Sequence, residues 1–516
     1  MTDRVDGLLL GAAGTREVRM RPAAALKHGF VAGAPGTGKT TTVQVLAEAF
    51  SEAGVPVFAT DVGAELAGMS RPGGGNAAVE QRVDKLKLGA AWIRDGYPVV
   101  LWDPLGSHGH PVRVTVTQLG PLLLSRMLGL NDTQEAVLTV TFRVAHENAL
   151  PLLDTRDLRA MLKYAADNAS AISTTFGGVS AASIGTVQRA LLQFEERGGV
   201  RLLGEPALDV LDLVRTDERG RGVVNLLATD RLITSRGAYS ALLIWLLSEL
   251  RDRLPEAADP QKPALVVLID DAGLLFEGAP QPLIDTVDGI LRALSRRGVG
   301  VFFATENPVD LPERIVCHLG NKVLHALRDY TPRDERRVTA AVELLRTNPA
   351  FMAEIAVTAL ASGEALVSVV ADDGSPSKAE RTIVVPPRSH LGPIAEEARL
   401  ALVASSPIAG RYDAIVDRES AYEVLKARAE EQAAAAAVAA EEAAQAKAAL
   451  EQARLEAAQA RAKAAAERAA RTARGRGDQL LDAASKSAVR TMGNQVGRTI
   501  IRGILGAIIK TGVTGS

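Results

Sequence analysis

Cysteine, aromatic residues and long apolar runs are all scarce in this chain of 516 residues. A single cysteine, Cys317, can form neither an internal disulfide nor a thiolate metal cluster, and the seven histidines show no zinc-ligand spacing. No uninterrupted run of about eighteen apolar residues occurs, so we expect no membrane-spanning helix. The apolar stretch 7–13 is too short and too rich in glycine for a secretory signal. These absences predict a cytoplasmic protein without a structural metal.

Neither sign of charge prevails in the composition. The chain has 59 Lys and Arg residues against 61 Asp and Glu residues, a net charge of −2. This balance excludes a globally basic nucleic-acid coat protein, so contact with DNA would need a local basic surface or the interior of a ring. The hydrophobic content of 47% suffices for a large buried core.

The N-terminal part of the chain contains an apolar stretch at 30–32, a glycine-rich segment at 33–40 and a helical apolar spacing at 41–50. A further apolar stretch at 55–60 predicts a second strand. Strand, loop, helix and strand in this order predict a βαβ unit. We therefore expect an α/β fold with a mostly parallel central sheet.

The glycine-rich segment matches the phosphate-loop pattern G-x-x-x-x-G-K-[ST]. Gly33, Gly36 and Gly38 allow backbone N–H groups to approach phosphate oxygens closely, and Lys39 supplies a compact positive charge. The hydroxyl of Thr40 is expected on Mg²⁺. The segment predicts a P-loop NTPase that binds ATP with Mg²⁺. The residues expected to bind the nucleotide are Gly33, Ala34, Pro35, Gly36, Thr37, Gly38, Lys39, Thr40 and Thr41.

A second apolar run, 265–269, ends in two acids, Asp270 and Asp271. This pattern is typical of a Walker B strand, in which the first acid holds the magnesium shell and the second polarises the attacking water. Asp270 is therefore the expected metal ligand and Asp271 the expected catalytic acid. The alternative is an ordinary buried strand that ends in a solvated acidic turn.

Two further positions are candidates for contact with the γ-phosphate. The apolar run 299–305 is followed by Glu306, Asn307 and Pro308, which form either a phosphate-sensing group or a simple Asn-Pro turn. Arg328 follows the apolar run 322–327 and is either an arginine finger for a neighbouring subunit or a surface residue. With Lys39 and Asp271, Glu306 and Arg328 complete the expected catalytic set.

The remaining patterns divide the chain into five parts. We expect the N-terminal part of the ATPase core at 1–61, an inserted mainly helical subdomain at 62–221 and the rest of the core at 222–425. Additional strands are predicted at 99–102, 223–228 and 365–370, and helices at 119–130, 132–146, 157–168, 183–197 and 238–254. An Ala-rich helical spacer is expected at 426–477 and a basic amphipathic segment at 478–516.

The two C-terminal parts leave alternatives open. The Ala-rich stretch lacks the Leu/Ile stripe of a stable coiled coil, so it is either a solvated spacer or a partner-binding helix. The basic segment has Lys and Arg but no acid between 485 and 510. It suits the inner surface of a membrane, a protein partner or the chain's own core equally well.

Many short segments of the chain resemble the bacterial HerA-helicase-like ATPase family, a relative of the HerA and FtsK hexameric motors. The resemblance spans about residues 8–422 and includes HALR at 325–328 and GEAL at 363–366. The other matching segments are 28–33, 109–113, 120–124, 157–161, 204–206, 298–301, 320–322, 348–351 and 417–420. The resemblance implies a RecA-like ASCE core that forms a homo-oligomeric, hexameric ring, with ATP between subunits and an arginine from the neighbour. Relatives pump or unwind DNA.

The chain departs from the family pattern at three places. Asp271 stands where the family usually has Glu, Glu306 stands where it usually has Gln, and 61–66 replaces the usual Asp-x-Lys-Gly-Asp-Leu. The shorter Asp271 places its carboxylate about an ångström from the expected position, an error that costs on the order of a hundredfold in rate. Glu306 adds negative charge near the γ-phosphate unless an arginine pairs with it.

The sequence thus supports two functions. The first is an oligomeric HerA/FtsK-type ATPase that hydrolyses ATP to drive a ring motor on DNA. The second is a nucleotide-gated scaffold with weak hydrolysis, which recruits a partner or the membrane through its C-terminal arm.

Overall fold

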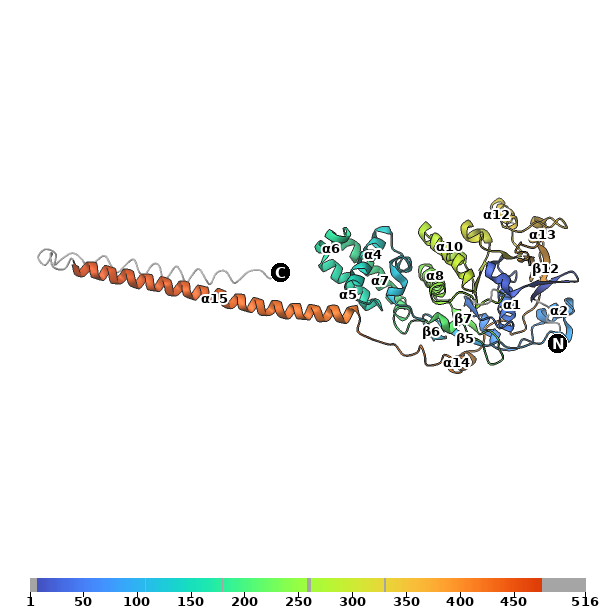
Figure 1. Cartoon of the computed structure of the whole chain (residues 1–516), viewed down its shortest axis with the longest axis horizontal. Coiled ribbons are helices and arrows are strands. Elements are labelled where there is room, and N and C mark those ends of the chain that lie inside the picture. The colour runs from blue at the N-terminus through green and yellow to red at the C-terminus, as the bar shows by residue number, and fades with distance from the viewer. Residues whose placement is uncertain (1–6, 107, 179, 258–260, 329–330, 476–516) are drawn as a thin grey trace. The chain divides into compact units, whose positions relative to one another are not determined.

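The computed structural model describes residues 7–106, 108–178, 180–257, 261–328 and 331–475 (Figure 1). The chain forms two compact units, residues 1–428 and residues 429–516, and each is described by itself. The predicted basic amphipathic segment 478–516 lies outside the described residues.

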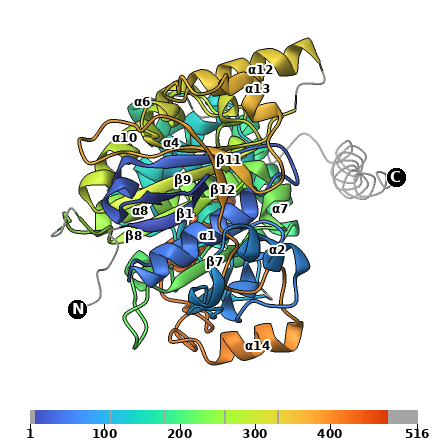
Figure 2. The ribbon, with the colours of Figure 1, turned by 90° about the vertical axis from the view of Figure 1, so that its right-hand side faces the viewer.

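One sheet of 12 strands, counted over the described residues, forms the centre of the first unit (Figure 2). The strands in spatial order are β2 (Arg16–Met20), β1 (Leu8–Ala13), β12 (Glu380–Val384), β11 (Glu364–Ser368), β10 (Asn321–His325), β3 (Gly29–Ala32), β9 (Val299–Thr305), β8 (Leu265–Ile269), β4 (Val57–Asp61), β7 (Val224–Ala228), β5 (Val99–Asp103) and β6 (His110–Pro111).

The sheet is parallel from β10 through β6 and antiparallel from β10 to β2. The predicted α/β fold with a mostly parallel sheet is confirmed. The parallel strands are nearly all apolar because both of their faces are buried. Strands β1, β2 and β12 were not predicted, since β2 and β12 contain charged residues and carry little apolar signal.

The strand order places β9 between β3, which precedes the glycine-rich loop, and β8, which precedes Asp270. All three strands are parallel, so their carboxyl ends meet at one edge of the sheet. This edge brings the predicted phosphate loop and the predicted acids to the same side of the molecule.

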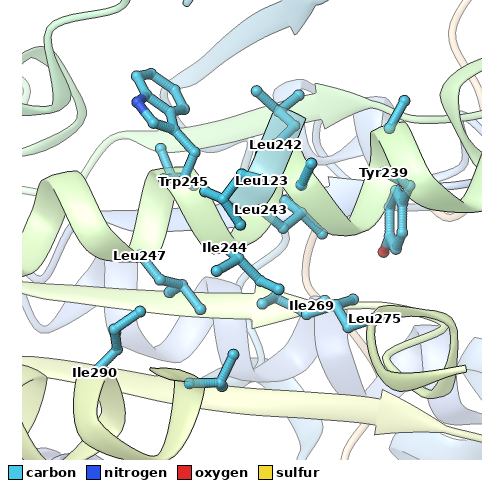
Figure 3. Packing of buried hydrophobic residues seen from close by; sticks show 14 of the residues in the cluster. Leu123, Tyr239, Leu242, Leu243, Ile244, Trp245, Leu247, Ile269, Leu275 and Ile290 are labelled. Atoms are coloured by element: carbon cyan, nitrogen blue, oxygen red, sulfur yellow. The ribbon is translucent and has the colours of Figure 1, made fainter. Parts of the chain in front are cut away.

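Alternate side chains of the central strands enter two hydrophobic cores on opposite faces. In β8, Val267 and Ile269 belong to one core, whereas Val266 and Leu268 belong to the other. On the first face lie α8 (Arg236–Arg253) and α10 (Gln281–Arg296). In Figure 3, Ile244 and Leu247 of α8 lie close to Ile269. The second face is covered by α1 (Lys39–Glu52).

A group of helices follows β6 in the chain and packs partly against α8 (Figure 1). It comprises α3 (Val116–Leu128), α4 (Asp132–Glu147), α5 (Thr155–Asp167), α6 (Ala169–Phe176) and α7 (Ala181–Glu196). Capping boxes begin α3, α4 and α5, which explains where these helices start. The boundaries 62 and 221 of the inserted subdomain stay a prediction, and β5 and β6 within this range belong to the main sheet.

The first unit has six further α-helices among the described residues. They are α2 (Ala77–Lys85), α9 (Gly273–Phe276), α11 (Glu313–Val316), α12 (Pro332–Glu343), α13 (Ala353–Thr358) and α14 (Glu396–Ala404). Within the described part of the chain, no helix combines the length and the apolarity that a bilayer span requires.

The Ala-rich stretch is one helix, α15 (Ala421–Gly475). Its first turn belongs to the first unit, where Ala421 and Leu425 are buried in the core. Every side chain from 426 to 471 is exposed. The helix therefore forms by intrinsic propensity, since packing contributes nothing along this length.

Candidate nucleotide-binding site

The loop between β3 and α1 is fixed by the strands on both sides of β3. The N–H of Gly33 donates to the carbonyl of Thr305 at the end of β9, with N and O 3.2 Å apart. The N–H of Ala34 donates to the carbonyl of Ala326, just after β10, over 2.9 Å. The chain then turns through Pro35 and enters α1 at Lys39.

The tip of the loop presents backbone donors. Among the described residues, five N–H groups of the loop and of the first turn of α1 have no hydrogen-bond acceptor: those of Gly36, Gly38, Lys39, Thr40 and Thr41. The N-terminus of a helix also carries the positive end of its dipole. Free donors at a positive helix end are the elements of a phosphate site. The structure thus places the predicted nucleotide-binding residues in one phosphate-accepting loop.

Close neighbours explain why two positions of the loop are glycine. A Cβ on Gly33 would stand 2.5 Å from the Cβ of His325, and a Cβ on Gly38 would stand 3.2 Å from the Cα of Gly363. Gly36 (φ +74°) and Gly38 (φ +115°) also have positive φ angles that side chains disfavour. The ammonium of Lys39 reaches back over the loop, where Nζ donates to the Gly33 carbonyl over 2.7 Å.

Asp270 is held at the end of β8 by two neighbouring elements. Its N–H donates to Oγ1 of Thr60 in β4 over 2.7 Å, and its carbonyl accepts the hydroxyl of Tyr239 in α8 over 2.5 Å. Neither Thr60 nor Tyr239 was predicted as a site residue. Tyr239 lies in a helix without any motif, so only the packing of α8 on the sheet identifies it.

The carboxyl of Asp270 has an unusual acidity. Burial, and after it the Asp271 carboxylate, raise its pKa to about 6. The N–H of Asp271 and the ammonium of Lys39 act in the opposite direction. Lys39 therefore lies near enough to the Asp270 carboxyl for the two charges to interact, and β9 lies between the strands that precede them.

Asp271 adopts a left-handed backbone with φ of 47°, and its N–H donates to Oδ1 of Asp270 over 2.9 Å. Short polar residues such as Asp and Asn enter this region more readily than longer side chains do. The backbone conformation therefore suits the residue that the chain has at this position, where the family usually has Glu.

Asp271 and Glu306 line one cavity of about 430 Å³ beyond the ends of β8 and β9. Asp310 and Glu277 line it too, but Asp310 pairs with Arg337 of α12 over 2.6 Å and Glu277 pairs with Arg236. Within the described residues, Asp271 and Glu306 have no ion pair. The cavity therefore holds two carboxylates without an ion-pair partner among the described residues, beside Thr305, whose carbonyl accepts the Gly33 N–H.

The other predicted positions lie apart from this cavity. Arg328 follows β10, is exposed, and has no hydrogen bond or ion pair within the described residues. Asp61 ends β4, and its carboxylate accepts the N–H groups of Glu65 (2.9 Å) and Leu66 (3.2 Å). Burial raises the pKa of Asp61 to about 6. Asp61 thus orders the loop that departs from the family pattern.

The residues present suit magnesium bound together with a nucleotide. The described residues contain no cluster of three or more His, Cys, Asp or Glu side chains that would hold a metal alone. Mg²⁺ is commonly held by one or two protein oxygens with the rest from phosphates and water. The Thr40 hydroxyl and the Asp270 carboxylate supply such a partial set.

A sequence profile described as "Helicase HerA-like C-terminal" matches residues 8–512. No curated protein matches the chain. The plasmid coupling protein TrwB in complex with a non-hydrolysable GTP analogue superposes with a TM-score of 0.50 and 13% identity, covering 75% of this chain and 91% of that chain.

Two further solved structures superpose with lower TM-scores. VirB4 of Thermoanaerobacter pseudethanolicus gives a TM-score of 0.49 with 14% identity over 74% of this chain and 97% of that chain. TrwB in complex with ADP and Mg²⁺ gives 0.47 with 12% identity over 81% and 92%. The superposition on TrwB agrees with the RecA-like P-loop fold. Because the family profile spans nearly the whole sequence, the chain belongs to the HerA-like C-terminal helicase family.

Proposed function

We propose that this chain binds ATP with Mg²⁺ and hydrolyses it slowly, as a subunit of a ring-shaped motor that acts on DNA. The observation that supports the proposal is the set of free N–H donors and the Lys39 ammonium at the same edge of the sheet as Asp270 and Asp271. TrwB, which has a similar fold, has been solved with a GTP analogue and with ADP and Mg²⁺.

Each site residue has a proposed role. The loop donors from Gly36 to Thr41 and the Lys39 ammonium bind the phosphate oxygens. Thr40 and Asp270 hold Mg²⁺, which when bound neutralises charge on the phosphates. Asp271 orients the attacking water, and Glu306 faces the terminal phosphate from the end of β9.

The cavity beside Asp271 and Glu306 supports slow turnover. Two unpaired carboxylates near a terminal phosphate repel its negative charge, so the site needs an additional cation. Arg328 is exposed and unpaired within the described residues, which suits an arginine donated to a neighbouring subunit. A site that needs a cation and an exposed arginine without a partner together support a homo-oligomer. Family membership supports a hexameric ring and a DNA substrate.

A second candidate function is a nucleotide-gated scaffold. The exposed length of α15 from 426 to 471 favours it, since this part of the helix offers a long surface to a partner and makes no contribution to the core. In this function ATP binding stabilises the oligomer, hydrolysis is negligible, and the C-terminal arm recruits a partner protein or a membrane.

Steady-state ATPase assays of the full chain with and without DNA separate these functions. The control is Lys39→Ala, which removes the phosphate-binding cation. Turnover above the Lys39→Ala background that DNA stimulates supports the motor. Nucleotide binding with turnover equal to that background supports the scaffold. Failure of the native chain to bind nucleotide would contradict both.

A further inference from the structure

His325, the last residue of β10, lies directly beneath the phosphate loop. Its side chain is 0% exposed. β10 pairs with β3 so that Leu324 is level with Ala32, which brings His325 beside Gly33. Its Cβ would be 2.5 Å from a Cβ on Gly33, and its Cε1 would be 3.6 Å from a Cβ on Gly38. The imidazole therefore lies under both ends of the loop.

The two ring nitrogens of His325 bond to two different elements. Nδ1 lies 2.9 Å from the carbonyl oxygen of Glu364 in β11, and Nε2 lies 2.9 Å from Oγ1 of Thr42 in α1. A carbonyl only accepts, so Nδ1 carries the hydrogen. In the neutral ring Nε2 is then an acceptor, and the Thr42 hydroxyl donates to it. The partners thus fix a single tautomer.

The ring is neutral at physiological pH. Burial lowers the pKa of His325 to about 4, with smaller contributions in the same direction from the nearby Lys39 ammonium and Arg82 guanidinium. Both hydrogen bonds described for the neutral tautomer therefore persist at the pH at which the protein works.

A second layer of bonds joins the same loop to the segment before β11. The N–H of Gly363 donates to the Thr37 carbonyl over 2.8 Å, and the Ser362 hydroxyl donates to the Gly36 carbonyl over 3.1 Å. The guanidinium of Arg82 in α2 donates to the Gly363 and Ser362 carbonyls over 2.7 and 2.9 Å. The segment 362–364, whose Glu364 carbonyl accepts a hydrogen bond from His325, is therefore also hydrogen-bonded to the phosphate loop.

We propose that His325 is a positioning residue for nucleotide binding, which ties α1 through Thr42 to β11 through Glu364 and so fixes the shape of the phosphate loop. The inference rests on the proposed nucleotide site. Histidine suits the position because its ring bonds at opposite ends. Phenylalanine would fill a similar volume but leave the Thr42 hydroxyl and the Glu364 carbonyl unpaired.

The expected effect is on affinity. A loop that must be ordered when the nucleotide binds loses affinity, and the loss of one buried hydrogen bond corresponds to about a tenfold change in Kd. Since His325 does not face the reacting atoms, kcat should stay within about twofold while KM rises.

The test is equilibrium binding of a fluorescent ATP analogue with Mg²⁺ to the full chain. The variants are His325→Phe, Thr42→Val, Thr42→Ser and the double variant His325→Phe with Thr42→Val. We expect about tenfold weaker binding for each of the first two. The double variant should bind no more weakly than His325→Phe alone, because both changes remove the same bond. Thr42→Ser, which keeps the hydroxyl, should bind like the native chain.

Two buried residues far along the chain serve as matched controls. Thr141 is 0% exposed and bonds only within α4, and His110 is 1% exposed with no hydrogen bond to its ring nitrogens within the described residues. Thr141→Val and His110→Phe should leave the Kd unchanged. They report what the loss of a buried hydroxyl or imidazole does elsewhere in the fold.

Two results would overturn the inference. One is native Kd in both His325→Phe and Thr42→Val, including the case in which only thermal stability falls. The other is a double variant whose loss equals the product of the single losses. If His325→Phe fails to fold, the pair Thr42→Val and Thr42→Ser decides alone. If the native chain binds no nucleotide, the proposed function itself fails and this inference with it.

Discussion

The backbone N–H of Asp271 donates to the carboxylate of the preceding residue, Asp270, while Asp271 itself has a left-handed φ of 47°. The bond turns the Asp270 carboxylate toward its own main chain and turns the Asp271 side chain away from the strand direction into the cavity beside Glu306. The two acids are thus placed by one local conformation.

Asp271→Asn should abolish most hydrolysis and leave nucleotide binding intact. Asn keeps the left-handed backbone but cannot accept a proton or carry charge, so turnover should fall by on the order of a hundredfold or more. ATPase assays and nucleotide titrations measure the two effects. Unchanged turnover in this variant would remove Asp271 from the mechanism.

Asp271→Glu should raise turnover and lower stability. The added methylene carries the carboxylate about an ångström further, and an error of that size costs on the order of a hundredfold in rate. The longer side chain is less suited to a φ of 47°, at a cost of about 1 kcal/mol. Parallel ATPase and urea-unfolding measurements check both directions. A folded variant with lower turnover would show that the site is built for Asp.

Tyr239→Phe should lower the free energy of unfolding by about 1 kcal/mol, because the carbonyl of Asp270 loses its hydrogen-bond donor. Tyr164→Phe is the matched control, since the Tyr164 hydroxyl has no hydrogen bond within the described residues. Chemical denaturation of the three proteins makes the comparison. Equal losses in both variants would show that the bond to Asp270 contributes nothing specific.

The protein should lose stability as the pH falls below 6.5, partly through His28. Val301 N–H donates to Nδ1 of His28 over 3.1 Å, so that nitrogen must stay unprotonated. Burial lowers the pKa of His28 from 6.5 to about 4. Because the folded pKa is depressed, the stabilisation is present above pH 6.5 and is lost as the pH falls toward 4.

Between pH 7 and pH 5 this loss amounts to about 2 kcal/mol for one such histidine. His28→Asn, whose side chain does not titrate in this range, should show a shallower fall over the same range. Urea unfolding at both pH values measures the difference. His325 contributes a similar term, so the slope should shrink in the variant and not vanish.

Truncation within or just before α15 should leave stability unchanged at one end point and lower it at another. Among the residues whose burial the structure describes, a chain ending at residue 428 loses only exposed side chains, those of 429–471, so its melting temperature should match that of the full chain. A chain ending at 419 also loses Ala421 and Leu425 from the core and the Tyr422 N–H bond to Asp157 over 2.9 Å. We expect roughly 3 kcal/mol lower stability. Calorimetry of both chains provides the measurement.

The sequence predicts the phosphate loop well because its donors, its lysine and its hydroxyl are neighbours in the chain. The strand before Asp270 is predicted for the same reason, since an apolar run and its terminal acids are contiguous. The bonds from Thr60 and Tyr239 to Asp270, and from His325 to Thr42, join residues far apart in sequence. They depend on the order of strands in the sheet, which no local pattern specifies.

Two strands on the antiparallel side of the sheet were missed for a different physical reason. β2 (Arg16–Met20) and β12 (Glu380–Val384) carry charged residues on the partly solvated antiparallel side of the sheet, so they lack the apolar runs that mark the parallel strands. Periodicity is a weak signal in segments of 5 residues with mixed charge.

The hydrogen bond from Gly33 to the Thr305 carbonyl links the phosphate loop to Glu306 through a rigid body. The Thr305 carbonyl and the Glu306 N–H belong to the same peptide plane, which resists twisting. A rotation of this peptide plane would turn both the Glu306 N–H and the oxygen that accepts the Gly33 N–H. The backbone of Glu306 and the backbone of Gly33 are therefore coupled through a single peptide group and one hydrogen bond.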